Sequence, residues 1–401
     1  MVPDFRRLWV VGLLVAVARW LEMLVIGIVV FQATQSAFLV ATMTLLRLTP
    51  MGMFGVLAGV LAERLTRHLS LLGVVAVQGI AVGALSLSAA LGHLAVWQVA
   101  VAAFAGGLGW ATDNPVRRMM IGDAVGPQRI TSAMSLDVMA NNASRIAGPA
   151  LGGTLLAVLG PAEAFGLGFA LYLVAFGAAL RIGTGRRTGA AQPASILREM
   201  RESFGLALRL PRLRAVLLIT VVFNVFAWPC TSMIPVIAQA SLRFDPGATG
   251  LLASMDGIGA LAGAALVVAL GWAERHAAIY FGGTACYLLG MAWFALSPTP
   301  VVAGAALLVT GLAGAGFATM QAMMTYLAAP AEIRGRALGL LSTAIGSGLL
   351  DFLQIGLLAD WLGAPAATCV VAGQGLLVLW LSRRTWRGLF EAGNGSPLSQ
   401  S

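Results

Sequence analysis

Long apolar segments follow one another along the whole chain and decide what it can fold into. Of the 401 residues, 59% are apolar and only 10% are charged. A helix that crosses a bilayer needs about 20 mostly apolar residues, because its backbone amides find no water in the hydrocarbon core. The pattern therefore predicts an all-α membrane protein. Twelve segments qualify: residues 8–31, 37–61, 69–91, 94–116, 131–158, 162–181, 214–240, 248–272, 277–296, 299–325, 336–361 and 365–382.

Little chain lies outside these segments. The longest hydrophilic stretch, residues 182–213, is too short for a soluble catalytic domain. The first segment begins shortly after Arg6 and Arg7, as a signal peptide would. Its apolar run is too long for a signal peptide and contains Arg19 and Glu22, so we expect it to remain as a membrane span.

The arginines predict the orientation of the chain. The formal net charge is +9, and the sequence contains no lysine. Outside the apolar segments, Arg243 alone falls in an odd-numbered connection, whereas the other arginines fall in even-numbered connections or near the ends. Because positive charge is retained on the cytoplasmic side, both termini are predicted to be cytoplasmic. A charge that follows the membrane topology in this way indicates the lipid bilayer, and not nucleic acid, as its partner.

The segments form two groups of six on either side of a hydrophilic linker. We predict an N-terminal six-helix bundle over residues 1–181, a cytoplasmic linker over 182–213, a C-terminal six-helix bundle over 214–384 and a cytoplasmic tail over 385–401. From residue 195 onward, apolar residues of the linker recur at helical spacing, which indicates a helix lying on the inner membrane surface. A solvated spacer is an equally good interpretation.

The two halves also share short motifs, as expected of transporters built from repeats. GVLAERLTRH at residues 59–68 is matched by GWAERH at 271–276, and LGPA at 159–162 is matched by LGAPA at 362–366. With twelve segments, a central linker and these repeats, the chain resembles the major facilitator superfamily over nearly its full length.

The motif at residues 59–68 carries much of this resemblance. It is similar to the loop motif G-x-L-A-D-R-x-G-R-R that joins the second and third spans of the superfamily, and it supplies Gly59, Glu63, Arg64 and Arg67. Glu replaces the usual Asp and Thr replaces the second Gly. The resemblance implies a latch on the cytoplasmic side, in which the basic residues pair with acids at helix ends such as Asp113. Ordinary anchoring of the arginines at the membrane surface is the alternative.

A second motif lies in the fifth segment, where NNASRIAGPALGG interrupts the apolar sequence at residues 141–153. Its Gly148, Pro149, Gly152 and Gly153 are similar to the end of the antiporter motif G-x8-G-x3-G-P-x-x-G-G, with Ser at both upstream glycine positions. Small residues four apart also favour close helix packing by themselves. The stretch RWLEMLVIGIVVFQATQSAFLVAT at 19–42 is similar to the exporter branch that includes enterobactin and macrolide efflux proteins.

Together these resemblances imply two six-helix bundles that alternate access to a central site, with drug and proton antiport. The sequence departs from this superfamily at one residue position that takes part in proton coupling. Many proton-coupled exporters of the superfamily carry an Arg in the fourth span shortly before a Gly-rich run, whereas only Ala and Phe stand at the expected places ahead of GGLG at 106–109. We therefore expect Arg19 or Arg145 to take this role.

Charged residues at membrane depth are functional candidates by default, since each costs several kcal/mol unless it faces a partner or a cavity. Three of the acids, Glu22, Asp256 and Asp351, are the candidates for proton coupling. Arg19 and Glu22 lie three residues apart on one helical face and are expected to be able to pair with each other. The charged residues within the segments are Arg19, Glu22, Arg47, Asp137, Arg145, Asp256 and Asp351.

A polar stripe runs along the fifth segment, where Asp137, Asn141 and Arg145 are spaced by four residues and share one helical face. It predicts part of a substrate path. The full set of path candidates is Arg19, Arg47, Asp137, Asn141, Arg145, Asn224, Trp228, Gln321 and Gln354. For those in the C-terminal half, plain helix packing is the alternative.

The sequence thus predicts a secondary active exporter that moves a small amphipathic molecule, such as a drug or a siderophore, across the bacterial inner membrane, in exchange for protons and as a monomer. A lipid or lysolipid flippase, an importer on the same fold and a membrane sensor are the alternatives. We expect no enzyme activity, cofactor or metal, because the three histidines lie at segment ends and no catalytic motif is present.

Overall fold

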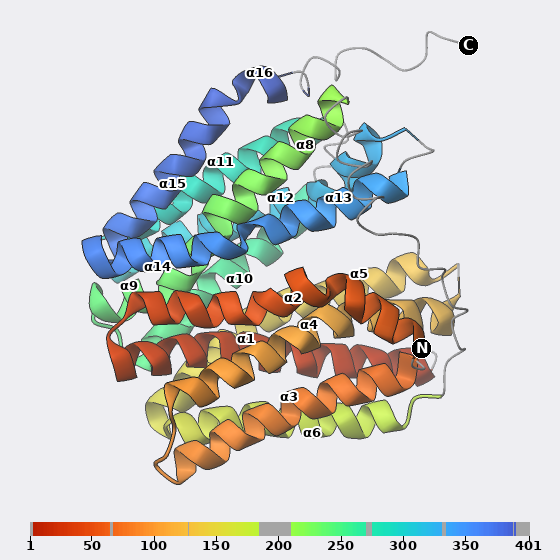
Figure 1. Cartoon of the computed structure of the whole chain (residues 1–401), viewed down its shortest axis with the longest axis vertical. Helices are drawn as coiled ribbons and strands as arrows, with labels where there is room; N and C mark the ends of the chain where they lie inside the picture. Colours follow the sequence, from red (N-terminus) through yellow and green to blue (C-terminus); the bar gives the residue numbers. More distant parts are fainter. Residues whose placement is uncertain are drawn as a thin grey trace. The chain divides into compact units, whose positions relative to one another are not determined.

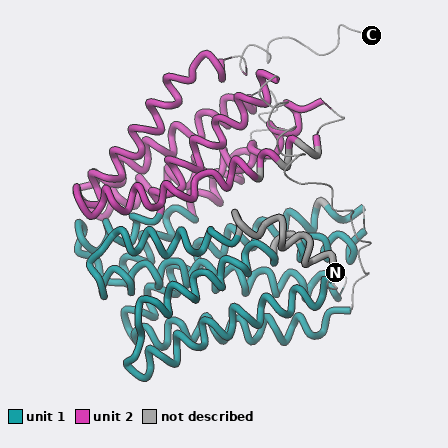
Figure 2. Tube along the Cα trace, viewed as in Figure 1, with its two compact units in different colours: residues 1–191, 232–257 teal, residues 192–231, 258–401 magenta. Residues whose placement is uncertain are grey.

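The computed structural model describes residues 3–64, 67–126, 128–183, 210–269, 275–330, 334–387 and 389, and its described elements are all helices (Figure 1). They group into two compact units (Figure 2). Unit 1 contains residues 1–191 and 232–257, and unit 2 contains residues 192–231 and 258–401. Relative to the predicted bundles, residues 232–257 group with the N-terminal helices. The predicted interfacial helix of the linker lies outside the described residues.

Unit 1 is built around one buried helix. α1 packs against α2, α4, α5 and α6, and α3 packs against α4 and α6. The helices are α1 (Pro3–Thr34), α2 (Ala37–Arg64), α3 (Arg67–Ala90), α4 (Val96–Val125), α5 (Ile130–Val158) and α6 (Pro161–Leu180). Because neighbours surround α1, it buries side chains on all sides, including its two mid-helix charges, Arg19 and Glu22.

The glycines of the GPALGG motif bring two helices close to α5. A Cβ atom on Gly148 would lie 2.6 Å from Cβ of Trp20 and 2.8 Å from the backbone nitrogen of Leu21, both in α1. Gly153 faces the start of α10 (Pro246–Ala269), where a Cβ would lie 2.7 Å from Cα of Gly250. The close helix contact expected from the motif is therefore present, and it has two partners because Gly148 and Gly153 lie on different faces of α5.

Helices of the C-terminal half of the sequence are interrupted in two places, and the first interruption spans residue 232, from which the chain groups with unit 1. The first interruption separates α8 (Pro211–Val222) from α9 (Ile234–Ala240) by a π-helical turn, η1 (Phe223–Ala227), and a 3-10 turn, η2 (Trp228–Met233). Pro229 and Pro235 lack the backbone N–H that a regular helix would use there. The second separates α13 (Arg334–Gly346) from α14 (Asp351–Leu362) by a 3-10 turn, η4 (Ser347–Leu350). The two interruptions meet, since Gly348 packs directly against the carbonyl of Asn224.

Aromatic side chains fill the interior of unit 2. Phe223 stacks on Phe317 with ring centroids 3.8 Å apart, and Tyr280 stacks on the same ring at 5.1 Å. The Tyr280 hydroxyl donates to the carbonyl of Val216 at 3.0 Å, so its polar end is satisfied inside the apolar core. The remaining helices are α11 (His276–Ala295), α12 (Pro300–Ala328), α15 (Ala364–Leu381) and the short α16 (Arg383–Trp386).

By length and composition, nine helical segments of the described chain can cross a membrane, which makes the protein a multi-pass membrane protein. α2 contributes a shorter apolar helix over Ala37–Pro50. α4 and α5 are outside this set, and they carry much of the buried charge described below. The nine segments are Pro3–Thr34, Arg67–Ala90, Pro161–Leu180, Pro211–Ala240, Pro246–Val267, His276–Ala295, Pro300–Ala328, Thr343–Leu362 and Ala364–Leu381.

Replacing Gly148 by Ala is expected to destabilise the protein, because the new methyl group would press on the α1 backbone. Overpacking of this kind costs about 1–3 kcal/mol. Gly177 in α6 is the matched control, since no heavy atom lies within 4 Å of its would-be Cβ. Gly177→Ala should leave the apparent unfolding temperature unchanged or raise it, because Ala favours helix. Thermal unfolding of both purified variants measures the difference, and equal unfolding temperatures would contradict the close contact.

Candidate functional site

Two groups of buried ion pairs tie α1 to its neighbours in unit 1. In the first, Nη2 of Arg47 in α2 donates to Oε2 of Glu22 in α1 at 2.5 Å. Nη1 of Arg47 donates to the carbonyl of Arg19 at 3.3 Å. Both side chains are almost completely buried, at 3% and 1% exposed. Inside a membrane protein such a pair holds two charges that neither water nor lipid could solvate.

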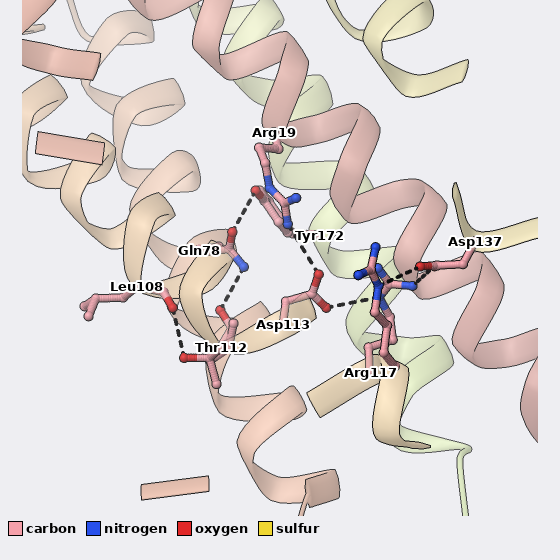
Figure 3. A network of polar contacts seen from close by, with 10 residues as sticks. Arg19, Gln78, Leu108, Thr112, Asp113, Arg117, Asp137 and Tyr172 are labelled. Atoms are coloured by element: carbon pink, nitrogen blue, oxygen red, sulfur yellow. Dashed lines mark hydrogen bonds and ion pairs between the residues drawn. The ribbon is translucent and has the colours of Figure 1, made fainter. Parts of the chain in front are cut away.

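The second group links α1, α4 and α5 (Figure 3). Nη2 of Arg19 contacts Oδ2 of Asp113 in α4 at 3.3 Å, and Nε of Arg117, one turn further along α4, lies 3.4 Å from Oδ1 of the same carboxylate. Nη1 of Arg117 also pairs with Asp137 in α5. The second carboxylate oxygen of Asp137 lies 3.5 Å from Nε of Arg118. Acids and arginines therefore alternate through the network, and each buried charge has an opposite neighbour.

The partners on α1 differ from those expected. Arg19 and Glu22 share a helical face, but each reaches a different helix, namely α4 for Arg19 and α2 for Glu22. The packing of α1 against both α2 and α4 brings a charge of opposite sign from another helix to each of them. The expectation that Arg19 and Glu22 pair with each other is therefore wrong.

Glycines provide the space that the guanidinium groups occupy. A Cβ on Gly106 would lie 2.5 Å from Nη2 of Arg47, and Gly107 packs directly on the Arg47 carbonyl. Gly12 in α1 faces the guanidinium of Arg117 in the same way. The GGLG run of α4 therefore accommodates an arginine that belongs to α2, although α4 has no arginine at the expected place before that run.

Two uncharged residues complete this region and were missed in the sequence. The Tyr172 hydroxyl in α6 donates to Oε1 of Gln78 in α3 at 3.3 Å (Figure 3). Both side chains are buried, and Tyr172 lies beside Glu22. A single Tyr or Gln in an apolar segment carries no spacing signal. Only the polarity of Gln78 within an apolar helix could have pointed to it.

A third ion pair is more accessible than the others. Nη2 of Arg145 in α5 contacts Oδ2 of Asp256 in α10 at 2.5 Å, and the two side chains are 21% and 12% exposed. The guanidinium of Arg145 also lies 5.1 Å from the ring centroid of Trp20, which is a cation–π distance. Asn141, the third member of the predicted stripe with Asp137 and Arg145, is half-buried. The stripe thus divides, with Asp137 in the sealed network and Arg145 in a separate, accessible pair.

In the predicted cytoplasmic latch, the loop motif pairs with an acid other than Asp113. Arg67, at the start of α3, pairs with Asp123 near the end of α4, where the carboxylate is 55% exposed. Asp113 instead belongs to the buried network, because Arg19 and Arg117 reach it inside the bundle. The pairing expected between the loop motif and Asp113 is therefore corrected to Asp123 for Arg67. The side chains of Gly59, Glu63 and Arg64 lie outside the described residues.

Two of the amide candidates of unit 2 form hydrogen bonds to described residues outside the candidate set. Nδ2 of Asn224 donates to the carbonyl of Thr220 at 2.9 Å, and Nε2 of Gln354 donates to Oε1 of Gln374 at 2.9 Å. Trp228 and Gln321 are half-buried. Asp351 is half-buried at the start of α14, and no described side chain forms an ion pair with it. The described residues contain no group of three potential metal ligands.

Neutralising Glu22 should cost more stability than neutralising an acid in an exposed pair. Glu22→Gln leaves the buried Arg47 cation without a counterion, which costs about 3–5 kcal/mol. The double variant Glu22→Gln/Arg47→Gln removes both charges and is expected to unfold at a higher temperature than Glu22→Gln. Asp123→Asn is the control, since exposed pairs contribute less than about 1 kcal/mol. Thermal unfolding of the purified variants tests this, and a Glu22→Gln protein as stable as the wild type would contradict it.

Comparison with known proteins gives the family. A family model described as transmembrane secretion effector matches residues 2–387. No curated protein matches the sequence significantly. Among solved structures, a POT family transporter in complex with 5-aminolevulinic acid is 11% identical with a TM-score of 0.75, covering 98% of this chain and 96% of its own.

Two further structures have the same fold. The nucleoside transporter NupG is 13% identical with a TM-score of 0.72, covering 98% of this chain and 100% of its own. A bacterial homologue of the human lysosomal transporter Spinster is 14% identical with a TM-score of 0.68, covering 99% and 100%. At these identities the likeness shows a shared transporter fold. Because the family model spans nearly the whole sequence, the chain belongs to the transmembrane secretion effector family of major facilitator transporters.

Proposed function

We propose that the protein is a proton-driven secondary active exporter that carries a small amphipathic molecule out of the bacterial cytoplasm across the inner membrane. The family description, which refers to secretion, supports the direction of transport. The membrane-transporter fold supports alternating access. In this proposal all twelve apolar segments of the sequence are spans, both termini are cytoplasmic and the protein acts as a monomer.

The observation that carries the proposal is the contrast between Asp351 and the other acids at membrane depth. Glu22, Asp113, Asp137 and Asp256 each contact an arginine. If one of these carboxylates bound a proton, it would leave a buried cation without its counterion. Asp351 can gain or lose a proton without that cost, because no described residue pairs with it.

The position of Asp351 also suits a coupling residue. It follows η4, the 3-10 interruption between α13 and α14, and Gly348 of that turn packs on the carbonyl of Asn224 at the π-helical turn of α8. Transporters often place ion and substrate sites at interrupted helices, where backbone groups are freed from regular helix bonding. Among the three predicted proton-coupling acids, Asp351 is therefore the one we assign to the proton.

Protonation of Asp351 would then control access. An ionised carboxylate is costly to enclose away from water, whereas the neutral acid is much less so. The closed intermediate of the empty transporter, between the outward-open and inward-open states, would form readily only when Asp351 is protonated. A proton that enters from outside would thus permit the return step after the substrate has left.

Asp351→Asn is expected to abolish transport driven by a pH gradient while preserving exchange of labelled for unlabelled substrate, because the neutral side chain can be enclosed but cannot carry a proton. Proteoliposomes with an imposed pH gradient measure both activities, with ethidium as a cationic probe and naphthalene-2-sulfonate as an anionic one. Asp4→Asn, in an exposed pair with Arg7, is the control and should transport normally.

Several outcomes would redirect the proposal. Gradient-driven flux that is unchanged in Asp351→Asn would remove the coupling role of Asp351. Gradient-driven movement toward the cytoplasmic face would indicate an importer, and lipid movement without probe flux would indicate a flippase. The absence of any flux in the wild-type protein would favour a sensor.

A further inference from the structure

We infer that Arg145 is a receptor for the anionic group of the transported molecule, that Asp256 occupies this receptor when it is empty, and that the molecule is an aromatic anion whose ring stacks beside Trp20. This inference rests on the proposed export function and names its substrate class. All three residues belong to unit 1.

The first reason concerns exposure, since of the three described arginines within the apolar segments of unit 1, namely Arg19, Arg47 and Arg145, Arg145 is the most accessible. Arg19 is 2% exposed and Arg47 is 3% exposed, and both are enclosed by partners from other helices. Arg145 is 21% exposed and contacts a single acid. Arg145 can therefore contact a ligand inside the apolar part of the bundle, whereas Arg19 and Arg47 are enclosed.

The second reason is that the pair is incomplete. Nε of Arg145 and Oδ1 of Asp256 are both buried without a hydrogen-bond partner among the described residues, so the two side chains share one contact and not the two of a bidentate pair. Nε of Arg47 and Oε1 of Glu22 are likewise without a hydrogen bond, but that pair is almost completely buried, whereas Arg145 is accessible to a ligand. The indole Nε1 of Trp20 is a further buried donor without a described partner. An oxyanion with three oxygens, such as a sulfonate or phosphate, would offer more acceptors to these donors than Asp256 does.

The third reason is the aromatic platform under the guanidinium. The ring of Trp20 lies 5.1 Å from Cζ of Arg145, and Trp110 meets Trp20 edge-on at a centroid distance of 6.5 Å. Both tryptophans are half-buried. A planar ring attached to the anionic group could stack on this pair while the anion binds Arg145, which favours aromatic over aliphatic anions.

The fourth reason is that α5 and α10 do not need the ion pair to stay together. A Cβ on Gly257 would lie 2.8 Å from the backbone carbonyl of Arg145, and Oγ of Ser254 donates to the carbonyl of Ile146 at 2.9 Å. Gly153 and Gly250 form a second close contact two turns away. Since these contacts fix the helices, the Arg145 side chain can exchange Asp256 for a ligand without loss of the local packing.

Isothermal titration calorimetry on the purified full-length protein tests the inference with naphthalene-2-sulfonate as the probe. Naphthalene-2-sulfonamide is the neutral match, and cyclohexanesulfonate is the non-aromatic match. The wild-type protein should bind the aromatic sulfonate more tightly than either analogue. Asp256→Asn should bind it about tenfold more tightly, because the internal competitor is gone, and Arg145→Gln should lose binding.

Three further variants keep the result interpretable. Trp20→Leu should reduce the affinity for the aromatic probe to that for cyclohexanesulfonate. Asp123→Asn removes an acid from another arginine in unit 1 and should leave the affinity unchanged. The exchange variant Arg145→Asp/Asp256→Arg keeps an ion pair between the two helices but moves the arginine from α5 to α10. It serves as the test if Arg145→Gln fails to fold. Unchanged sulfonate binding in the exchange variant would overturn the inference.

The inference is overturned if the sulfonamide binds as tightly as the sulfonate, or if Asp256→Asn does not bind the sulfonate more tightly. Its failure is distinguishable from failure of the proposed function. Gradient-driven flux of ethidium without sulfonate binding would refute the anion receptor alone. Sulfonate binding without gradient-driven flux would refute the proton-driven exporter alone.

Discussion

The structure of unit 1 depends on neutralising charges that the surrounding lipid cannot solvate. α1 carries Arg19 and Glu22 in a helix that is buried on all sides, and each would be prohibitively costly there if it stood alone. Pairing one to α4 and the other to α2 satisfies both and fixes the rotation of α1 relative to two neighbours at once. The small residues Gly12, Gly106 and Gly107 follow from the same requirement, since the guanidinium groups need room between closely packed helices.

Most of the described charges at membrane depth are neutralised in this way, so the charges that are accessible or unpaired stand out as candidates for function. Arg145 and Asp256 form the one described buried cross-helix pair whose two members both retain appreciable exposure, and Asp351 has no described ion-pair partner. We propose that Arg145 exchanges an anion and Asp351 a proton for this reason, whereas the remaining buried pairs are sealed by their partners. The division between a rigid N-terminal network and a few adaptable charges is what a transporter requires, because it must change state without unfolding its core.

Sequence patterns predicted which charged residues lie within the helices better than they predicted which residues meet. Apolar length located the helices, and the cost of membrane charge selected Arg19, Glu22, Arg47, Asp137, Arg145, Asp256 and Asp351. Helical spacing could not supply the partners, because it reports a shared face on one helix and not which other helix lies opposite. Asp113 shows the limit, since its place near a helix end suggested the latch, whereas the packing of α1 against α4 brings Arg19 to it. Gln78 and Tyr172 have no periodic signal at all.

The placement of Asp256 suggests how events at Arg145 reach the rest of the protein. α10 is one continuous helix whose residues up to 257 group with unit 1 and whose later residues group with unit 2. Its first part is held by α5 through Gly250 and Gly257, and its second part is held by α12, where a Cβ on Gly263 would lie 2.9 Å from Cα of Leu312. A continuous helix held at both ends resists local bending, because backbone hydrogen bonds join its successive turns. If a substrate anion replaces Asp256, as we infer, the exchange takes place on a helix whose residues belong to both units.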